Sequence, residues 1–237
     1  MCRWTVRTLS LFMLLLALLP AASAGGKKAE KPPRTGPDEP DLASFDEMME
    51  RFVRENEVPG AALAVAKDGR LVYARGFGYA DPDAKTPVQP RALFRIASIS
   101  KPLTAAAILR LMELGKLKLN DTAFDLLKLA PLPGNDEDPR LKKVTVLELL
   151  HHTAGFDRGA SFDPMFRPIE IAKAFKANPP ADPAQIIRYM LGHKLDFDPG
   201  SRYAYSNYGY CVLGRVIEKA SGKRYEAFVR DTVLNPL

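Results

Sequence analysis

A change in hydrophobic period along the chain constrains the fold most. Ala61–Ala66 and Leu71–Phe77 are two apolar runs with the character of strands. Asp68-Gly69 stands between them, a dipeptide typical of tight hairpin turns. From about residue 97 onward the apolar residues recur instead at helical spacing. The pattern predicts an α+β chain, with an antiparallel hairpin followed by a mostly helical region.

Helices are expected on both sides of this hairpin. The helix before it has an apolar stripe, which we interpret as core, and ends near Pro59-Gly60. After a loop over 81–90, an apolar helix opens at Ser98, and Thr145 with Glu148 three residues later forms a capping-box pattern. The apolar stripe of the helix before the hairpin consists of Phe45, Met48, Met49, Phe52 and Val53. Later helices are expected over 181–191, 208–220 and around 228–234.

The N-terminus has the pattern of a secretory signal. Arg3 and Arg7 precede an apolar run over Leu9–Leu19, which is short for a membrane span, and Ala22-Ser23-Ala24 is a small-x-small cleavage pattern. We expect residues 1–24 to be a signal peptide, with an uncleaved anchor as the alternative. Either way the remaining chain is exported, to the periplasm or outside the cell. No later stretch is apolar and long enough to cross a bilayer.

Two further regions follow from composition. Residues 25–41 are rich in Gly, Pro and charged residues, which predicts a flexible linker, and residues 42–237 are expected to fold. The chain is 46% hydrophobic, enough for a core, and its net charge falls from +6 to +4 if Arg3 and Arg7 leave with the signal. Basic residues are scattered among acidic ones, which gives no argument for nucleic-acid binding.

Ser98 and Lys101 form an S-x-x-K motif at the start of the apolar helix. Residues three apart share a helix face, so the amine can reach the hydroxyl. A serine needs a neighbouring base to become a nucleophile, and a helix N-terminus favours a developing oxyanion. About one such motif is expected by chance in a chain of this size, so the alternative is a capping Ser and a solvated Lys.

Tyr205-Ser206-Asn207 gives a Y-x-N motif after the turn at Pro199-Gly200. A tyrosine whose pKa is lowered by nearby cations can transfer protons, and an Asn amide can bind both a lysine and a substrate amide. Four tyrosines crowd this segment, so the alternative is a packed aromatic turn.

Four segments in the same order together resemble the serine β-lactamase-related and penicillin-binding-protein family. This family includes class C β-lactamases, low-molecular-weight D,D-peptidases and family VIII esterases. The segments are F-R-I-A-S-I-S-K over 94–101, L-L-H-H-T-A-G-F over 149–156, P-G through Y-S-N-Y-G-Y over 199–210, and V-L-N-P-L over 233–237. The resemblance implies a β-lactamase/transpeptidase-like fold, in which helices flank an antiparallel sheet beside a mostly helical region.

The resemblance also implies roles. Ser98 would be the acylated nucleophile and one oxyanion donor, Lys101 its base or the partner of the base, and Tyr205 the general base. Asn207 would orient Lys101 and the substrate amide. His152 would line the substrate site mainly by shaping the segment around it, and its neighbour His151 faces elsewhere, so no metal pair is expected. No cofactor is implied.

The family carries a third motif, K-T-G or H-x-G, on a later strand of its sheet, and this chain ends at Leu237. The expectation is therefore a partial domain without the C-terminal strands and with one oxyanion donor fewer, which lowers rates about 100- to 1,000-fold. The leading hypothesis is an exported serine hydrolase acting on an ester, amide or β-lactam carbonyl of a small molecule or peptide. The alternatives are an inactive module that binds cell-wall peptides or β-lactams, and a fragment completed by another chain. Oligomeric state is left open.

Overall fold

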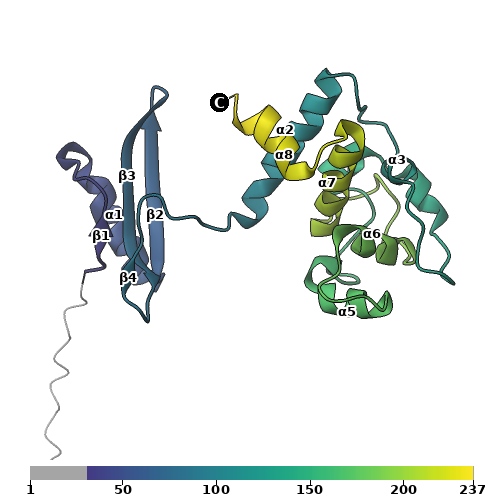
Figure 1. Cartoon of the computed structure of the whole chain (residues 1–237), viewed down its shortest axis with the longest axis horizontal. Helices are drawn as coiled ribbons and strands as arrows, with labels where there is room; N and C mark the ends of the chain where they lie inside the picture. Colours follow the sequence, from purple (N-terminus) through teal and green to yellow (C-terminus); the bar gives the residue numbers. More distant parts are fainter. Residues whose placement is uncertain (1–30, 237) are drawn as a thin grey trace, which may run out of the picture. The chain divides into compact units, whose positions relative to one another are not determined.

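The computed structural model describes residues 31–236 (Figure 1). The expected signal peptide over 1–24 and the first part of the expected linker lie outside the described residues. The chain divides into two compact units, one ending at Phe94 and the other beginning at Arg95, and each has its own core. Within residues 31–236, the helices are all too short or too polar to span a bilayer.

The first unit is built on the predicted hairpin. Strand β2 (Gly60–Lys67) pairs antiparallel with β3 (Arg70–Asp81), which confirms the prediction. The turn residues Asp68 and Gly69 have φ values of +51° and +72°. A two-residue turn with both φ values positive matches the twist of its strands, and Asp-Gly is among the sequences that adopt it most readily.

Two short strands extend this sheet along β3. Strand β1 (Arg34–Thr35) pairs with Phe77 and Gly76 of β3, and the strand order is β1-β3-β2. Strand β4 (Thr86–Pro87) pairs with the C-terminal end of β3, inside the segment expected to be a loop. The flexible linker expected over 25–41 is therefore wrong for the part containing β1.

Ion pairs explain why this polar segment is ordered. The Arg34 guanidinium lies 3.2 Å from the Asp46 carboxylate and 3.4 Å from that of Glu50, and both acids are buried. A segment of low hydrophobicity can become ordered when its charges neutralise buried partners and its backbone joins a sheet. Composition alone does not show such partners.

Helix α1 (Ala43–Glu55) forms as expected, but its buried face differs from the predicted stripe. Met49 and Val53 pack in the core of the first unit, whereas Met48 and Phe52 are 41% and 48% exposed. The buried face is partly polar, because the Asp46 carboxylate accepts hydrogen bonds from Tyr73 Oη and Arg75 Nη1, at 2.7 and 2.9 Å.

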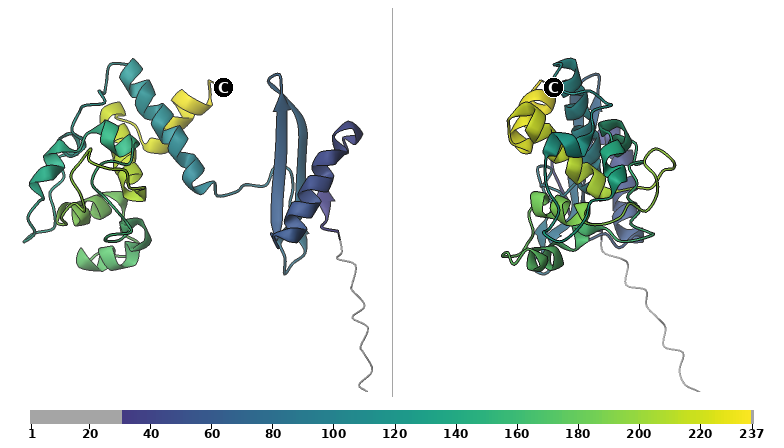
Figure 2. Two further views of the ribbon diagram at one scale, coloured as in Figure 1. Left: turned by 180° about the vertical axis from the view of Figure 1, so that it is seen from behind. Right: turned by 90° about the vertical axis from the view of Figure 1, so that its right-hand side faces the viewer.

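The second unit is mostly helical, and α7 (Asn207–Ser221) packs against most of its other helices (Figures 1 and 2). Within the described residues of this unit, seven helices and the intervening turns bury one continuous apolar core. The other helices are α2 (Ser100–Glu113), α3 (Ala123–Leu127), α4 (Val146–Leu150), α5 (Pro168–Ala174), α6 (Pro183–Leu191) and α8 (Tyr225–Val229). Short 3-10 turns are η2 (Ala97–Ile99), η3 (Pro139–Lys143) and η4 (Pro164–Phe166), and a π turn, η5 (Arg230–Leu234), follows α8.

Local signals place several of these helix ends. The capping box expected at Thr145 is present at the start of α4, with Thr145 Oγ1 accepting from the Glu148 N–H and the Glu148 carboxylate accepting from the Thr145 N–H. Helix α7 ends at Gly222, whose φ of +72° is the left-handed conformation that glycine adopts at helix C-termini. Helix α2 packs against α7. The S-x-x-K motif lies at the start of α2, and the Y-x-N motif lies at the start of α7.

Candidate active site

Ser98 lies in the 3-10 turn η2, directly before α2, and its side chain is exposed. The preceding residue, Ala97, has a φ of +44°, which is unusual for a residue with a Cβ. Among residues 31–236, the Ser98 N–H donates to no backbone carbonyl. Backbone strain beside an exposed serine is typical of functional sites, and the N–H at this helix start is available to an anion.

Lys101 connects the two motifs. Its Nζ donates to Ser98 Oγ at 3.1 Å, as the spacing of the S-x-x-K motif predicts, and to Asn207 Oδ1 at 2.8 Å. A lysine amine has several donor hydrogens, so it can hold both contacts at once. The pair of hydrogen bonds fixes the amine next to the hydroxyl.

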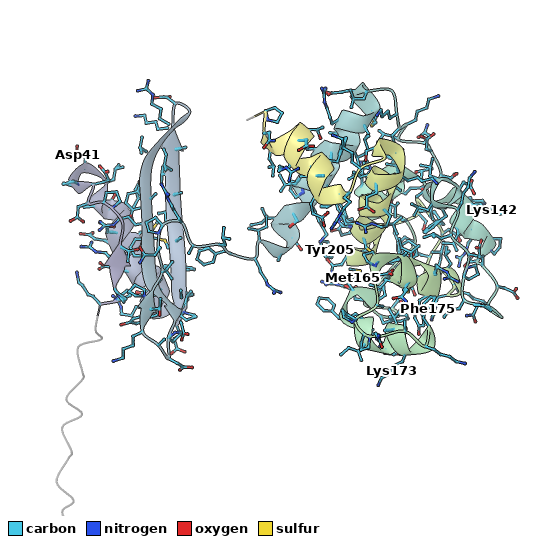
Figure 3. The ribbon with its side chains drawn as sticks, in the orientation of Figure 1. Asp41, Lys142, Met165, Lys173, Phe175 and Tyr205 are labelled. Atoms are coloured by element: carbon cyan, nitrogen blue, oxygen red, sulfur yellow. The ribbon has the colours of Figure 1, made fainter. Side chains whose placement is uncertain are left out.

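Tyr205 completes the contacts of the serine. Its Oη lies 2.6 Å from Ser98 Oγ, and the position of Tyr205 is labelled in Figure 3. Lys101 Nζ lies 4.7 Å from the ring centroid and Arg158 Cζ lies 5.0 Å from it. The pKa of the Tyr205 phenol is lowered mainly by Lys101, then by the Ser98 hydroxyl and, at longer range, by Arg158. Burial acts in the opposite direction. The phenolate is thus easier to form than that of a tyrosine in water.

The Y-x-N segment is held by the cap of α7. Ser206 is the N-cap residue, and its Oγ accepts from the Gly209 N–H at 3.0 Å. Asn207 is the first residue of the helix, and Tyr205 stands just before the cap. The cap therefore positions the residues on either side of it, because an N-cap serine fixes the direction in which the chain enters the helix.

His152 contacts the same segment. Its carbonyl accepts from the Ala204 N–H at 2.8 Å, and its Nδ1 accepts from the Ser206 N–H at 3.1 Å. Its ring centroid lies 4.7 Å from that of Tyr205. Burial and, to a lesser extent, Lys101 lower the pKa of His152, so the ring is neutral near pH 7 with its proton on Nε2. His152 therefore shapes the segment that carries Tyr205.

Two residues of this site were not predicted from the sequence. Arg158 lies over the Tyr205 ring, and Asp163 Oδ2 accepts a 2.7 Å hydrogen bond from Asn207 Nδ2. Neither residue belongs to a motif. Asp163-Pro164 does carry the signal of a helix cap, but no sequence pattern indicates a contact with a residue 44 positions away. Sets of three or more His, Cys, Asp or Glu side chains placed to hold a metal ion do not occur within 31–236.

The structure thus brings together Ser98, Lys101, Tyr205 and Asn207, with His152 behind the tyrosine. The Ser98 hydroxyl contacts both an amine and a phenol of lowered pKa, and it lies at a helix N-terminus. This arrangement can activate a serine as a nucleophile. These contacts are the ones that the resemblance to the serine β-lactamase-related family implies for Ser98, Lys101 and Asn207.

Comparison with known proteins identifies the family. The family model for Beta-lactamase matches residues 45–237, so the chain belongs to this family. Protein flp of Staphylococcus aureus strain N315 is 30% identical over 193 residues, which cover 81% of this chain and 36% of that protein. The resemblance to the serine β-lactamase-related and penicillin-binding-protein family is thereby confirmed.

Solved structures give the same result. The octameric penicillin-binding protein homologue from Pyrococcus abyssi aligns with a TM-score of 0.65 and 30% identity, over 83% of this chain and 43% of that one. EstCE1, described as a hydrolase with promiscuous acyltransferase activity, aligns with a TM-score of 0.63 and 27% identity, over 82% of this chain and 51% of that one. The β-lactamase/transpeptidase-like fold is confirmed, and the chain spans about half or less of the length of these relatives.

Proposed function

We propose that this chain is a serine hydrolase that acts through an acyl-serine intermediate on an ester, amide or β-lactam carbonyl. The contact of Ser98 Oγ with Tyr205 Oη at 2.6 Å and with Lys101 Nζ at 3.1 Å carries the proposal. It supplies a nucleophile, a proton acceptor and a cation within hydrogen-bonding distance of one another. The family membership supports hydrolysis in general, and the EstCE1 likeness supports acyl transfer in particular.

The first half of the proposed reaction forms the acyl-enzyme. The Tyr205 phenolate takes the proton of Ser98 as Oγ forms a bond to the carbonyl carbon, and Lys101 stabilises the phenolate beforehand. The Ser98 N–H donates to the oxyanion of the tetrahedral intermediate. When the intermediate collapses, the bond to the leaving group breaks and the Tyr205 hydroxyl gives it the proton.

The second half releases the acid. Tyr205, again a phenolate, takes a proton from water as the water oxygen attacks the acyl carbon, and the proton then returns to Ser98 Oγ as the ester bond breaks. Asn207 has one N–H beyond its contact with Asp163, which can bind a substrate carbonyl. His152 holds the backbone of the Tyr205 segment throughout and takes no proton.

We also propose that the chain works outside the cytoplasm. The support is the basic, apolar and small-residue pattern of residues 1–24, which is typical of secretory signals. Cell-wall peptides and extracellular esters are the substrates that such a location makes available, and no metal or organic cofactor takes part in the proposed steps.

Steady-state turnover tests the proposal. The chain over 25–237 would be assayed with p-nitrophenyl acetate, a chromogenic cephalosporin and a peptide ending in D-Ala-D-Ala, beside Ser98→Ala. We expect multiple turnovers of at least one substrate and a loss of at least about 1,000-fold in the variant. Binding of these compounds with no turnover by the folded wild-type chain would instead favour the inactive binding module.

A further inference from the structure

Asp163 is the strongest feature of the site that the proposed reaction leaves without a role. It lies just before the 3-10 turn η4 (Pro164–Phe166) and is partly buried. Its two carboxylate oxygens have different partners. Oδ1 accepts from the Met165 N–H at 3.0 Å, and Oδ2 accepts from Asn207 Nδ2 at 2.7 Å. The first contact caps the turn, and the second reaches a residue that contacts Lys101.

The chemistry of the two groups fixes the orientation of the Asn207 amide. An ionised carboxylate only accepts hydrogen bonds, so the amide NH₂ must face Asp163 and the carbonyl oxygen must face Lys101. A flipped amide would place its oxygen against the carboxylate and its NH₂ against the amine. The two orientations of an amide differ little in shape. Without Asp163, the Asn207 amide could therefore adopt either one, and Lys101 would lose Asn207 Oδ1 as a fixed hydrogen-bond acceptor.

We propose that Asp163 is a positioning residue of this active site, which holds the Asn207 amide in the one orientation that fixes Lys101 beside Ser98. The chain of contacts runs from a backbone N–H at η4 through Asp163 and Asn207 to the lysine amine. A hydrogen bond to an ionised group is stronger than a neutral one, and linked hydrogen bonds reinforce each other. This inference rests on the proposed function for its effect on rate, but the contact itself can be tested independently.

An exchange of the two side chains tests the direction of the hydrogen bond. In Asp163→Asn, one acceptor becomes a donor at unchanged shape, so either the cap or the Asn207 contact is lost. In Asn207→Asp, two carboxylates face each other. The double variant Asp163→Asn/Asn207→Asp restores a complete series of donors and acceptors from Met165 to Lys101. Asp163→Ser is the matched control, because its hydroxyl can still cap η4 but is too short to reach Asn207.

The first readout is the rate at which a small fluorophosphonate labels Ser98. We expect each single variant and the Ser control to label at least about tenfold more slowly than the wild-type chain. The double variant should recover most of the labelling rate that the less affected single variant loses. Labelling of Asp163→Ser, which cannot reach Asn207, at the wild-type rate, or a double variant as slow as the product of the two single effects, would overturn the proposal.

The pH profile separates positioning from a purely structural role. The groups that face the Tyr205 phenol are Lys101, Arg158, His152, Tyr210 and the Ser98 hydroxyl. Because Lys101 is the main cause of the lowered pKa of Tyr205, its displacement in Asp163→Ser should move the inflection of the labelling rate upward, toward pH 10. A slower rate with an unmoved inflection would count against the proposal.

The second readout does not depend on activity. Each single variant should lower the melting temperature by about 3 °C, and the double variant should recover most of this loss, since a hydrogen-bonded pair gives non-additive effects. If wild-type Ser98 does not react with the probe, the proposed function fails while this cycle still tests Asp163. Recovery then supports the contact, and additive losses overturn it.

Discussion

Replacement of Tyr205 by phenylalanine separates the chemistry of this residue from its packing. Tyr205→Phe removes the 2.6 Å hydrogen bond to Ser98 Oγ and the interaction of the phenol oxygen with Lys101. The ring contacts with His152, Lys101 and Arg158 do not involve the hydroxyl and are retained. The cost to folding should therefore be that of these partly exposed contacts, about 1 kcal/mol or less.

The effect on the reaction should be much larger. A positioned general base contributes about 100- to 10,000-fold to a rate, so acylation of Ser98 should slow by this factor. In the wild-type chain the reactive form is the phenolate, so the rate should rise with pH and level off above the pKa of Tyr205. Lys101 lowers this pKa, so the inflection should lie below 10, and it should be absent in the variant.

The assay is the rate of fluorophosphonate labelling from pH 6 to 10, followed by intact mass, with thermal denaturation as the control for folding. A folded Tyr205→Phe variant that labels at the wild-type rate with an unchanged pH dependence would refute the assignment of Tyr205 as the base. Labelling that is slower at every pH but keeps its inflection would place the titrating group elsewhere.

Two further predictions concern stability and are measured by urea denaturation. Asp138 is buried and accepts hydrogen bonds from Arg140 and from the Leu195 N–H, whereas Arg140 keeps Asp198 as a partner, so Asp138→Ala should cost about 1.5–3 kcal/mol at pH 7. Side-chain hydrogen bonds from Arg140 hold the pKa of Asp138 well below its usual range, so this contribution is complete above the unfolded value of about 3.9 and declines as the pH falls below it. A difference between wild type and variant that is as large at pH 2 as at pH 7 would contradict this cause. Thr145→Ala, which removes the capping box of α4, should cost about 1 kcal/mol, and no measurable loss would show that the cap is not needed there.

The parts of the fold that follow local rules were predictable from the sequence. Asp68-Gly69 gave the hairpin turn, Thr145 and Glu148 gave the start of α4, and the apolar period gave α6 and α7. The strand β1 was missed because its order depends on ion pairs with Asp46 and Glu50, which a polar composition does not reveal. The buried face of α1 was misread for the same reason, since it contains those two acids.

The candidate site divides in the same way. Ser98, Lys101, Tyr205 and Asn207 belong to motifs with fixed spacing, and the packing of α2 against α7 brings the two motifs together. Asp163 lies in a loop, and its contact with Asn207 depends on the path of the chain between α4 and α5. Such a contact has no sequence signature and appears only when the fold is known.

The proposed function requires that Ser98 is a competent nucleophile. Intact-mass measurement of the chain over 25–237 after incubation with a fluorophosphonate tests it, with Ser98→Ala beside Ser100→Ala as a matched control two residues away. We expect one adduct on the wild-type chain and on Ser100→Ala, and none on Ser98→Ala. Undiminished labelling of a folded Ser98→Ala variant, or no labelling of a folded wild-type chain, would contradict it.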